Sequence, residues 1–307
     1  MCDIVKDKAD ELSKKENVRA FYDFTEVISC SEIHSVHICT PHYLHVDMAI
    51  KALEAGKYVV LEKPAAMNLE ELKRLKEADE KYEGKLSLVL QNRVNPCVIE
   101  LNEDIKKSDC GELLGAKAYL TWKRTKEYYE QDAWRGKWET EGGGLMINQA
   151  VHTLDLLCWI SGGVESVSAT MSNKSLKDVI EVEDTAEAFF KLKCGGDAVF
   201  YATNAYTPGG SVNLEFNFEN VTYHYADNYL YKIEKGKMPA VIAGENVDVK
   251  WKNYWGLGHK KAISNFYDTI QGAGEGYITL SDGMHSTKVL FSMYESAKNN
   301  GEEIVID

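Results

Sequence analysis

The stretch that decides the fold is "SVHICTPHYLHVDMAIKALEAGKYVVLEKP", residues 35–64. A short β-rich run, "SVHICTP", precedes a helical pattern, "LHVDMAIKALEAG", which is closed by Gly56 and followed by a second strand, "KYVVLEKP". The helix "NLEELKRLKEADEKY", N-capped by Asn68, and the strand "LSLVLQNR" continue the alternation. Strands separated by helices of about 10 to 15 residues predict βαβ units and a parallel sheet.

The pattern changes after Asn95. A helix is expected over Pro96 to Lys107, and another over "LMINQAVHTLDLLCWISG". From Glu165 to about Lys252 most segments alternate in polarity and are joined by short turns, as in "EVEDTAEAFFKLKC", "DAVFYATNAY", "SVNLEFNF", "VTYHYA" and "VDVKW". Such segments predict a large, open, mainly antiparallel sheet. We therefore expect an α/β domain over residues 1–95 and an α+β domain over residues 96–307, the latter ending in two helices, near 259–271 and 281–299, and the run "EEIVID".

Composition excludes several classes of function. The net charge of −13, with no basic run interleaved with aromatic residues, argues against a nucleic-acid partner. No run approaches the roughly 18 apolar residues of a membrane span, and the start lacks a signal pattern, so we expect a cytoplasmic globular protein. The seven cysteines include no C-x-x-C pair, which favours reduced thiols over disulfides.

The first chemical motif is "VVLEKPAAMN". Glu62, Lys63 and Pro64 follow a predicted parallel strand, and open α/β sheets place their ligand crevice at the carboxyl ends of the strands. A lysine beside a glutamate suits proton transfer or the binding of a polar substrate. From spacing alone, a solvated lysine at a strand end remains the alternative.

The second motif is "ETEGGGLMINQAVHTLDLL". Its three glycines let the backbone pass close to a neighbour, and the helix that follows carries Asn148, His152 and Asp155 at positions i, i+4 and i+7 of one face. Histidine titrates near neutral pH, so His152 is the acid/base candidate. The alternative is a hydrogen-bonded core histidine.

Metal and nucleophile chemistry are not predicted. His42 and His45 have H-x-x-H spacing, but zinc needs at least three protein ligands and no further ligand is evident nearby. The chain has neither the G-x-S-x-G elbow nor the P-loop motif, so acyl and phosphoryl transfer lack their machinery.

Four segments in order resemble the glucose-fructose oxidoreductase / inositol dehydrogenase (Gfo/Idh/MocA) family: "CTPHYLHVDMAIKALEAGKYVVLEKP", "QNRVNP", "WRGKWETEGGGLMINQAVHTLDLLCWISGG" and "LSDGMHSTKVLFSMYESAKNNGEEI". The resemblance implies a Rossmann domain, a second domain with an open antiparallel sheet, and a nicotinamide cofactor between them. It also implies hydride transfer to or from a hydroxyl-bearing carbon of a sugar, polyol or sugar derivative. A homo-dimer or homo-tetramer formed through the antiparallel sheet is expected on the same ground.

The resemblance assigns roles to individual residues. Lys63 matches the active-site lysine, and His152 matches the histidine that exchanges a proton with the substrate hydroxyl. Asn148 stands where many members have aspartate, and we expect it to orient substrate instead of relaying a proton. The remaining implied positions are the substrate contacts Asp155, Arg93 and Trp134, and the cofactor contacts Thr40, Pro41, His45, Glu62, Lys63 and Pro64.

The beginning of the chain departs from the dinucleotide-binding pattern. The G-x-G-x-x-G turn is absent, while Asp3 fits the acidic position expected about 20 residues beyond it. We therefore expect Met1 to Ile4 to form the second Rossmann strand, with roughly 25 to 40 residues missing before Met1. Asp3 favours NAD over NADP by repelling a 2′-phosphate, although Lys6 and Lys8 weaken that preference and leave NADP possible.

Two other functions stay open at this point. A chain without the phosphate-binding turn could be a degenerate family member that binds a sugar or a partner protein without catalysis. NAD-dependent, redox-assisted glycoside cleavage is the other alternative.

Overall fold

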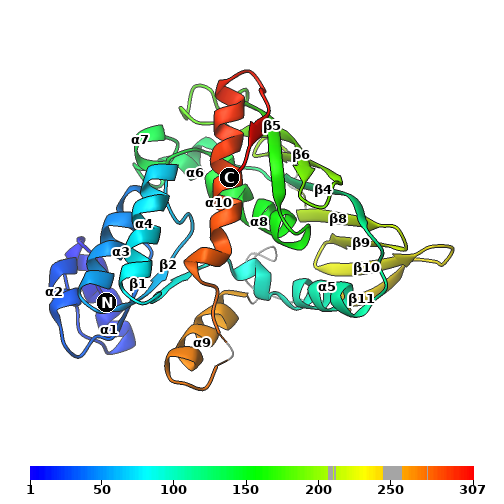
Figure 1. Ribbon diagram of the computed structural model, residues 1–307. Coiled ribbons are helices and arrows are strands. Elements are labelled where there is room, and N and C mark those ends of the chain that lie inside the picture. Colours follow the sequence, from blue (N-terminus) through cyan, green and yellow to red (C-terminus); the bar gives the residue numbers. More distant parts are fainter. Residues whose placement is uncertain (207–209, 211, 245–257, 275) are drawn as a thin grey trace.

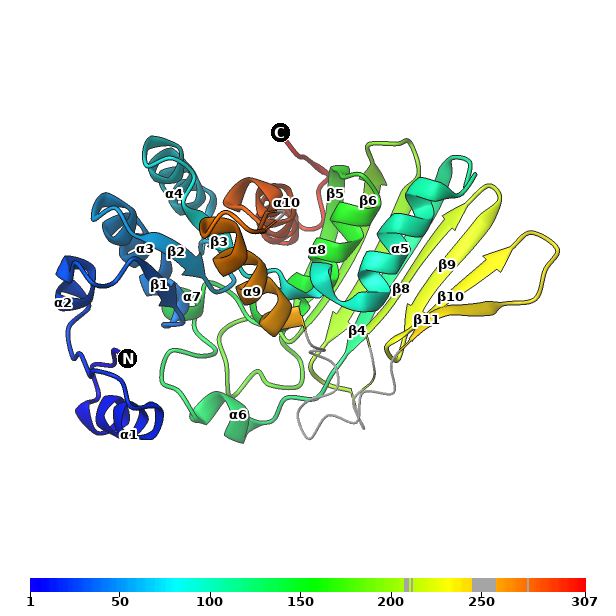
Figure 2. The same ribbon diagram turned by 90° about the horizontal axis from the view of Figure 1, so that it is seen from below.

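The computed structural model describes residues 1–206, 210, 212–244, 258–274 and 276–307. It has two lobes, a small parallel sheet with its helices and a large sheet with helices on one face, and a long helix lies between them (Figures 1 and 2). This confirms the predicted combination of a Rossmann-type domain with a second domain built on a large, mainly antiparallel sheet.

The first lobe contains the predicted βαβ alternation. Its parallel strands lie in the order β1 (Ser35–Ile38), β2 (Tyr58–Leu61) and β3 (Leu86–Leu88). The crossover helices are α3 (His45–Glu54) and α4 (Leu69–Lys81). The Asn68 side chain caps α4 by accepting a hydrogen bond from the Glu71 N–H, as the sequence predicted. Buried leucine, valine and alanine side chains on these helices pack against the strands and fix the sheet.

The first four residues do not form the strand expected from the sequence. Cys2 makes a single parallel bridge with Phe21, before the helices α1 (Lys6–Glu16) and α2 (Phe24–Ser29). The Asp3 carboxylate accepts a hydrogen bond from the Val5 N–H at 2.8 Å. This local turn directs the chain into α1 and ends any extended pairing after one bridge.

The second sheet has nine strands in the order β11-β10-β9-β8-β4-β7-β6-β5-β12 among the described residues. All neighbouring pairs are antiparallel except β4 and β7, which run parallel. The strands are β4 (Leu113–Thr121), β5 (Val164–Ser172), β6 (Thr185–Leu192), β7 (Asp197–Thr203), β8 (Val212–Phe218), β9 (Val221–Ala226), β10 (Tyr229–Glu234), β11 (Ala240–Gly244) and β12 (Ile304–Val305). The segment "VDVKW", expected to be a strand, lies outside the described residues.

Helices cover one face of this sheet. In Figure 2, α5 (Pro96–Lys107) and α8 (Val151–Ile160) lie against the strands, and their apolar residues share one core with the inward side chains of the sheet. Five short helical segments lie between these elements: η1 (His42–Leu44), η2 (Gln91–Val94), α6 (Lys126–Glu130), α7 (Trp138–Glu141) and the π-helical η3 (Met146–Ala150).

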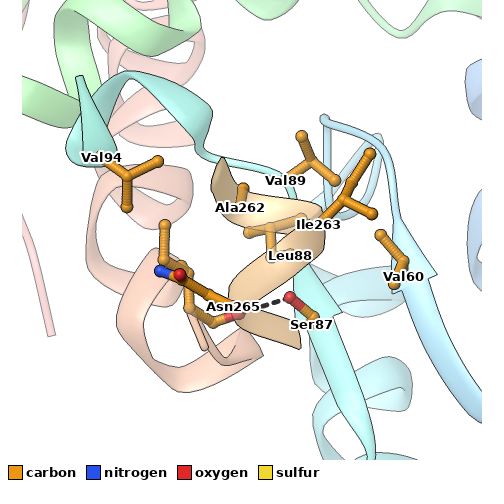
Figure 3. Close-up of a pocket in the computed structure, with 9 residues that line it drawn as sticks. Val60, Ser87, Leu88, Val89, Val94, Ala262, Ile263 and Asn265 are labelled. Atoms are coloured by element: carbon orange, nitrogen blue, oxygen red, sulfur yellow. Dashed lines mark hydrogen bonds between the residues drawn. The ribbon is translucent and has the colours of Figure 1, made fainter. Parts of the chain in front are cut away.

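The chain returns to the parallel sheet near its end, through α9 (Gly258–Ile270) and α10 (Leu280–Lys298). Phe266 of α9 is fully buried against Val60 and Val89. Figure 3 shows α9 seated on this sheet, where the remaining crevice of about 10 Å³ holds no more than a water molecule. The predicted boundary at residue 95 therefore separates α9 from the strands on which it packs.

Candidate active site

A cavity of about 390 Å³ opens where the end of β2 faces η3, α8 and the first residues after β4. Lys63, Asn148 and His152 all line it. The sequence placed Lys63 at a strand end and the other two on one helix face, and the fold brings the three into one cavity. An open α/β sheet is expected to bind ligands at this edge.

Lys63 is held by its neighbours. Its Nζ donates hydrogen bonds to the backbone carbonyl of Asn148 at 3.0 Å and to the Asn148 Oδ1 at 2.9 Å. Burial lowers the pKa of Lys63 to about 8, against the opposing effect of the Glu62 and Glu141 carboxylates. The side chain can therefore change its protonation state near neutral pH, which an exposed lysine does not do.

His152 is a neutral imidazole. Its Nε2 lies 3.2 Å from the amide nitrogen of Gln91. Because an amide nitrogen donates, His152 Nε2 accepts and the ring hydrogen lies on Nδ1. Burial, followed by the charge of Lys63, lowers the pKa of His152 to about 3. The Nε2 lone pair is therefore used by Gln91 here, and it can take a proton only when a substrate oxygen replaces that amide at Nε2.

A buried carboxylate stands behind Asn148. The Asn148 Nδ2 donates to Glu141 Oε1 at 2.5 Å, and Glu141 also accepts the Gly136 N–H. Glu141 is fully buried, and burial raises its pKa. A chain of hydrogen bonds therefore runs from the Lys63 ammonium through one amide to a carboxylate. The sequence reasoning did not select Glu141; its only signal is an acidic residue directly before the glycine run.

The glycine run does bring the backbone close to a neighbour. A Cβ at Gly144 would overlap the Glu183 carbonyl oxygen. The Glu183 carboxylate accepts hydrogen bonds from the N–H groups of Gly144 (3.0 Å) and Met146 (2.9 Å) and from the Tyr294 hydroxyl (2.9 Å). Burial raises the pKa of Glu183 to about 7. These bonds fix the start of the helical segment that carries Asn148 and His152.

Glu62, the residue before Lys63, pairs with a histidine of the C-terminal part of the chain. Its Oε1 is 3.4 Å from the His259 Nε2 at the start of α9. Burial acts to raise the pKa of Glu62, but the hydrogen bond with His259 and the neighbouring positive charges, among them Lys63, together lower it. Glu62, Lys63 and His259 all line the cavity.

Arg93 and Asp155 do not contact the cavity as the sequence predicted. They pair with each other through two hydrogen bonds, Nε to Oδ2 at 2.8 Å and Nη2 to Oδ1 at 2.6 Å. Arg93 also donates to the Asp282 carbonyl, and the Ser286 hydroxyl donates to Asp155. His152 and Asp155 are three residues apart on α8, and the Asp155 side chain contacts η2 and α10 instead of the cavity. The pair joins η2, α8 and α10 instead.

Trp134 also lies outside the residues that line the cavity. Its ring is 4.7 Å from the ring of His42, with the planes inclined by 54°. His42 Nδ1 lies 2.8 Å from the backbone carbonyl oxygen of Glu141, so the two rings lie beside the end of α7.

The expected cofactor residues that follow β1 and β2 lie together. One ring nitrogen of His45 is 2.8 Å from the Thr40 carbonyl oxygen and the other is 2.9 Å from that of Pro64, so this ring joins the two loops. Pro41 precedes η1 in the same segment, and the Lys63–Pro64 peptide bond is cis. The Thr40 hydroxyl is buried without a hydrogen-bond partner in the described part of the chain.

Within the described residues, no group of three or more His, Cys, Asp or Glu side chains could hold a metal ion. No described helix is long and apolar enough to cross a membrane.

Comparison with known proteins assigns the chain to a family. A family model for the GFO/IDH/MocA C-terminal domain matches residues 98–224, and the model for the oxidoreductase family with an NAD-binding Rossmann fold matches residues 1–89. The chain belongs to the GFO/IDH/MocA family. This confirms the resemblance seen in the sequence.

Several family members with named activities are similar to this chain. Levoglucosan dehydrogenase of Pseudarthrobacter phenanthrenivorans is 28% identical over 49% of this chain, and the match spans only 38% of that enzyme's length. Glucose-6-phosphate 3-dehydrogenase of Bacillus subtilis is 24% identical over 97% of this chain and 88% of its own. The crystal structure of the WlbA dehydrogenase from Bordetella pertussis, in complex with NADH and UDP-GlcNAcA, superimposes with a TM-score of 0.86 and 27% identity, covering 100% of this chain and 89% of that one.

Proposed function

We propose that this chain is an NAD-dependent dehydrogenase that acts on a hydroxyl-bearing carbon of a sugar, polyol or sugar derivative. The observation that carries the proposal is the placement of Lys63 and His152 in one cavity at the carboxyl ends of the parallel strands. The named activities of the similar dehydrogenases, and the NADH and sugar nucleotide bound to one of them, support it. A protein that only binds a ligand has no need of such an acid/base pair.

The two side chains of this pair have different roles at the substrate oxygen. As the carbinol carbon loses hydride, its hydroxyl must lose a proton, and neutral His152 accepts it at Nε2 once the substrate oxygen has replaced the Gln91 amide there. The Lys63 ammonium donates a hydrogen bond to the same oxygen and stabilises the negative charge that develops there. Reduction uses the same contacts in reverse. Asn148 fixes the Lys63 ammonium through the hydrogen bonds already described.

The loops after β1 and β2 are suited to the nicotinamide end of NAD, which supplies the hydride acceptor when bound. The buried Thr40 hydroxyl, without a partner among the described residues, fits a polar group of such a ligand. Glu62 lines the cavity, and Pro41, His45 and Pro64 belong to the same two loops. The preference for NAD over NADP through Asp3, and the cytoplasmic location, stay predictions.

The test is cofactor binding followed by a substrate screen. NADH and NADPH fluorescence titrations on the 307-residue chain measure binding, and sugars, polyols and nucleotide sugars are then assayed with both oxidised cofactors. Lys63→Met should abolish turnover, whereas Lys73→Met, a surface lysine of α4 in an ion pair with Glu77, should not. Unchanged turnover in Lys63→Met would remove this lysine from the mechanism.

The sheet also carries an apolar face suited to a second copy of this chain. Tyr119, Phe189, Val199 and Tyr201 are 38 to 50% exposed, and they are neighbours on β4, β6 and β7. A contiguous exposed patch of this kind is typical of an interface. We propose a homo-dimer or homo-tetramer through this face. Light scattering should show a smaller mass for Phe189→Glu and no change for Met238→Glu, which alters an apolar residue 86% exposed beyond β10.

A further inference from the structure

One wall of the cavity gathers two guanidinium groups around a single aromatic ring. The guanidinium carbon of Arg124 lies 5.0 Å from the centre of the Tyr128 ring, and that of Arg135 lies 4.9 Å from the same ring. Arg124 also lies 5.0 Å from the Trp122 ring, and Arg135 lies 4.5 Å from the Trp134 ring. Such stacking holds each planar group in place and leaves its edge free to donate hydrogen bonds.

Arg124 has a hydrogen-bond donor without an acceptor among the described residues. Its Nη1 donates to the Lys123 carbonyl oxygen at 2.9 Å, while its buried Nε has no partner in the part of the chain that the structure describes. Arg135 is better satisfied, through Asp132 at 3.1 Å and the Tyr128 hydroxyl at 3.0 Å. No carboxylate among the described residues pairs with Arg124 within 4 Å. A guanidinium without an anion in a partly enclosed site is a ready binding group for one.

The side chains that line the cavity include more cations than carboxylates. Among its described lining residues, Glu62 is the only carboxylate, and it faces His259. Three cationic side chains line the same space: Lys63, Arg124 and Arg135. Arg135 is paired with Asp132, and Glu141 lies behind Lys63, so Arg124 is the lining cation that lacks a carboxylate partner in the described part of the chain.

We propose that the substrate carries an anionic group, a carboxylate or a phosphate, which Arg124 and Arg135 bind at the wall around Tyr128 while its reacting hydroxyl lies at Lys63 and His152. The inference rests on the proposed dehydrogenase function, because it names the substrate class of that cavity. Planar guanidinium groups bind carboxylate and phosphate oxygens in pairs, and the aromatic rings hold the guanidinium groups in position before the ligand arrives.

Binding without turnover tests this directly. Isothermal titration of the chain with NADH present uses three probes of similar size: glucuronate, glucose 6-phosphate and uncharged glucose. We expect at least one anionic probe to bind about 10-fold or more tightly than glucose, as one charge-assisted pair of hydrogen bonds would provide. The two anionic probes distinguish a carboxylate from a phosphate. The preference should decrease with added salt, a measurement that needs no variant.

Two variants separate anion binding from packing. Arg124→Gln should reduce the preference for the anionic probe about 10-fold and leave glucose binding unchanged, and Arg124→Lys should retain part of it. Lys123→Gln removes an adjacent, exposed charge and should leave the preference intact. Equal binding of charged and uncharged probes by the unmodified chain would overturn the proposal, as would an equal loss for both in Arg124→Gln. A preference that persists in a chain without turnover on any sugar would support anion binding and contradict only the dehydrogenase function.

Discussion

Replacing Glu141 with glutamine removes the only charge in the chain of hydrogen bonds behind Lys63. The Lys63 ammonium donates to the Asn148 side-chain oxygen at 2.9 Å, and the amide nitrogen of Asn148 donates to Glu141 at 2.5 Å. The variant keeps the size of the side chain and an oxygen for Asn148, and it loses one acceptor for the Gly136 N–H. Its main effect should therefore be electrostatic.

The size of the effect follows from this geometry. Two hydrogen bonds and the width of one amide place the carboxylate about 7 Å from the ammonium. At an effective dielectric constant of about 20, the attraction is about 2 kcal/mol, or roughly 1.5 pKa units. Since burial brings the pKa of Lys63 to about 8 with Glu141 opposing the decrease, the Glu141→Gln value should lie roughly 1.5 units lower.

The assay measures the lysine itself and does not require turnover. Competitive acetylation of the chain over a range of pH, with the Lys63 peptide quantified by mass spectrometry, reports the fraction of uncharged amine. Glu139→Gln is the matched control, because it removes an exposed carboxylate from the same short helix and should leave the Lys63 titration unchanged. Thermal unfolding of each variant establishes that the fold is retained.

A second substitution tests whether the pKa of Lys63 responds to the charge of its neighbours or to their shape. Asn148→Asp in the Glu141→Gln background places a carboxylate directly against the Lys63 ammonium and should raise its pKa above that of the single variant. The reasoning is refuted if folded Glu141→Gln titrates at the same pH as the unmodified chain. It is also refuted if the double variant fails to raise the pKa.

Three further predictions follow from the buried charges. Asp155→Ala leaves Arg93 buried without its partner, so the free energy of unfolding in urea should decrease by about 3 to 5 kcal/mol; a loss below about 1 kcal/mol would contradict the role given to this pair. The folded pKa of Glu183, about 7, lies above its ordinary value of 4.5. The stability that this group contributes is therefore fully present below pH 4.5 and is lost as the pH rises to about 7. Compared with Glu183→Gln, the unmodified chain should lose about 3 kcal/mol over that range, and parallel curves would disprove the assignment. Because the pKa of His152 is about 3 and that of Lys63 about 8, kcat/KM for oxidation should be flat from pH 5 to 7 and decrease above about 8, whereas an ionisation near pH 6.5 would contradict a neutral His152.

Local sequence patterns were enough to predict the strand and the helical segment that carry Lys63, Asn148 and His152. The alternation of strands and helices over residues 35–90 defines a parallel sheet because each helix returns the chain to the same end of the sheet and buries one face against the strands. Lys63 then follows a strand directly, and Asn148 and His152 are four residues apart on one helical segment, so their placement depends on short-range geometry. The sequence predicted all three for this reason.

The strand expected at Met1 to Ile4 failed on a local detail that the pattern did not reveal. A strand forms only where several residues pair with a neighbour, and Cys2 has a single bridge before the Asp3 carboxylate turns the chain. The sequence pattern therefore predicts an extended segment, whereas its pairing depends on which residues come to lie beside it.

By itself, the sequence determined the order of the elements, the two polar motifs and the family to which they point. Only the tertiary structure decided which charges meet: Arg93 with Asp155, 62 residues apart, and Glu141 behind Lys63 through Asn148, 85 residues from that lysine. The physical reason is that a side chain's partner depends on how distant segments pack and on the phase of the helix that carries it. Asp155 meets Arg93 of η2 and Ser286 of α10, two segments that the sequence pattern does not place beside it.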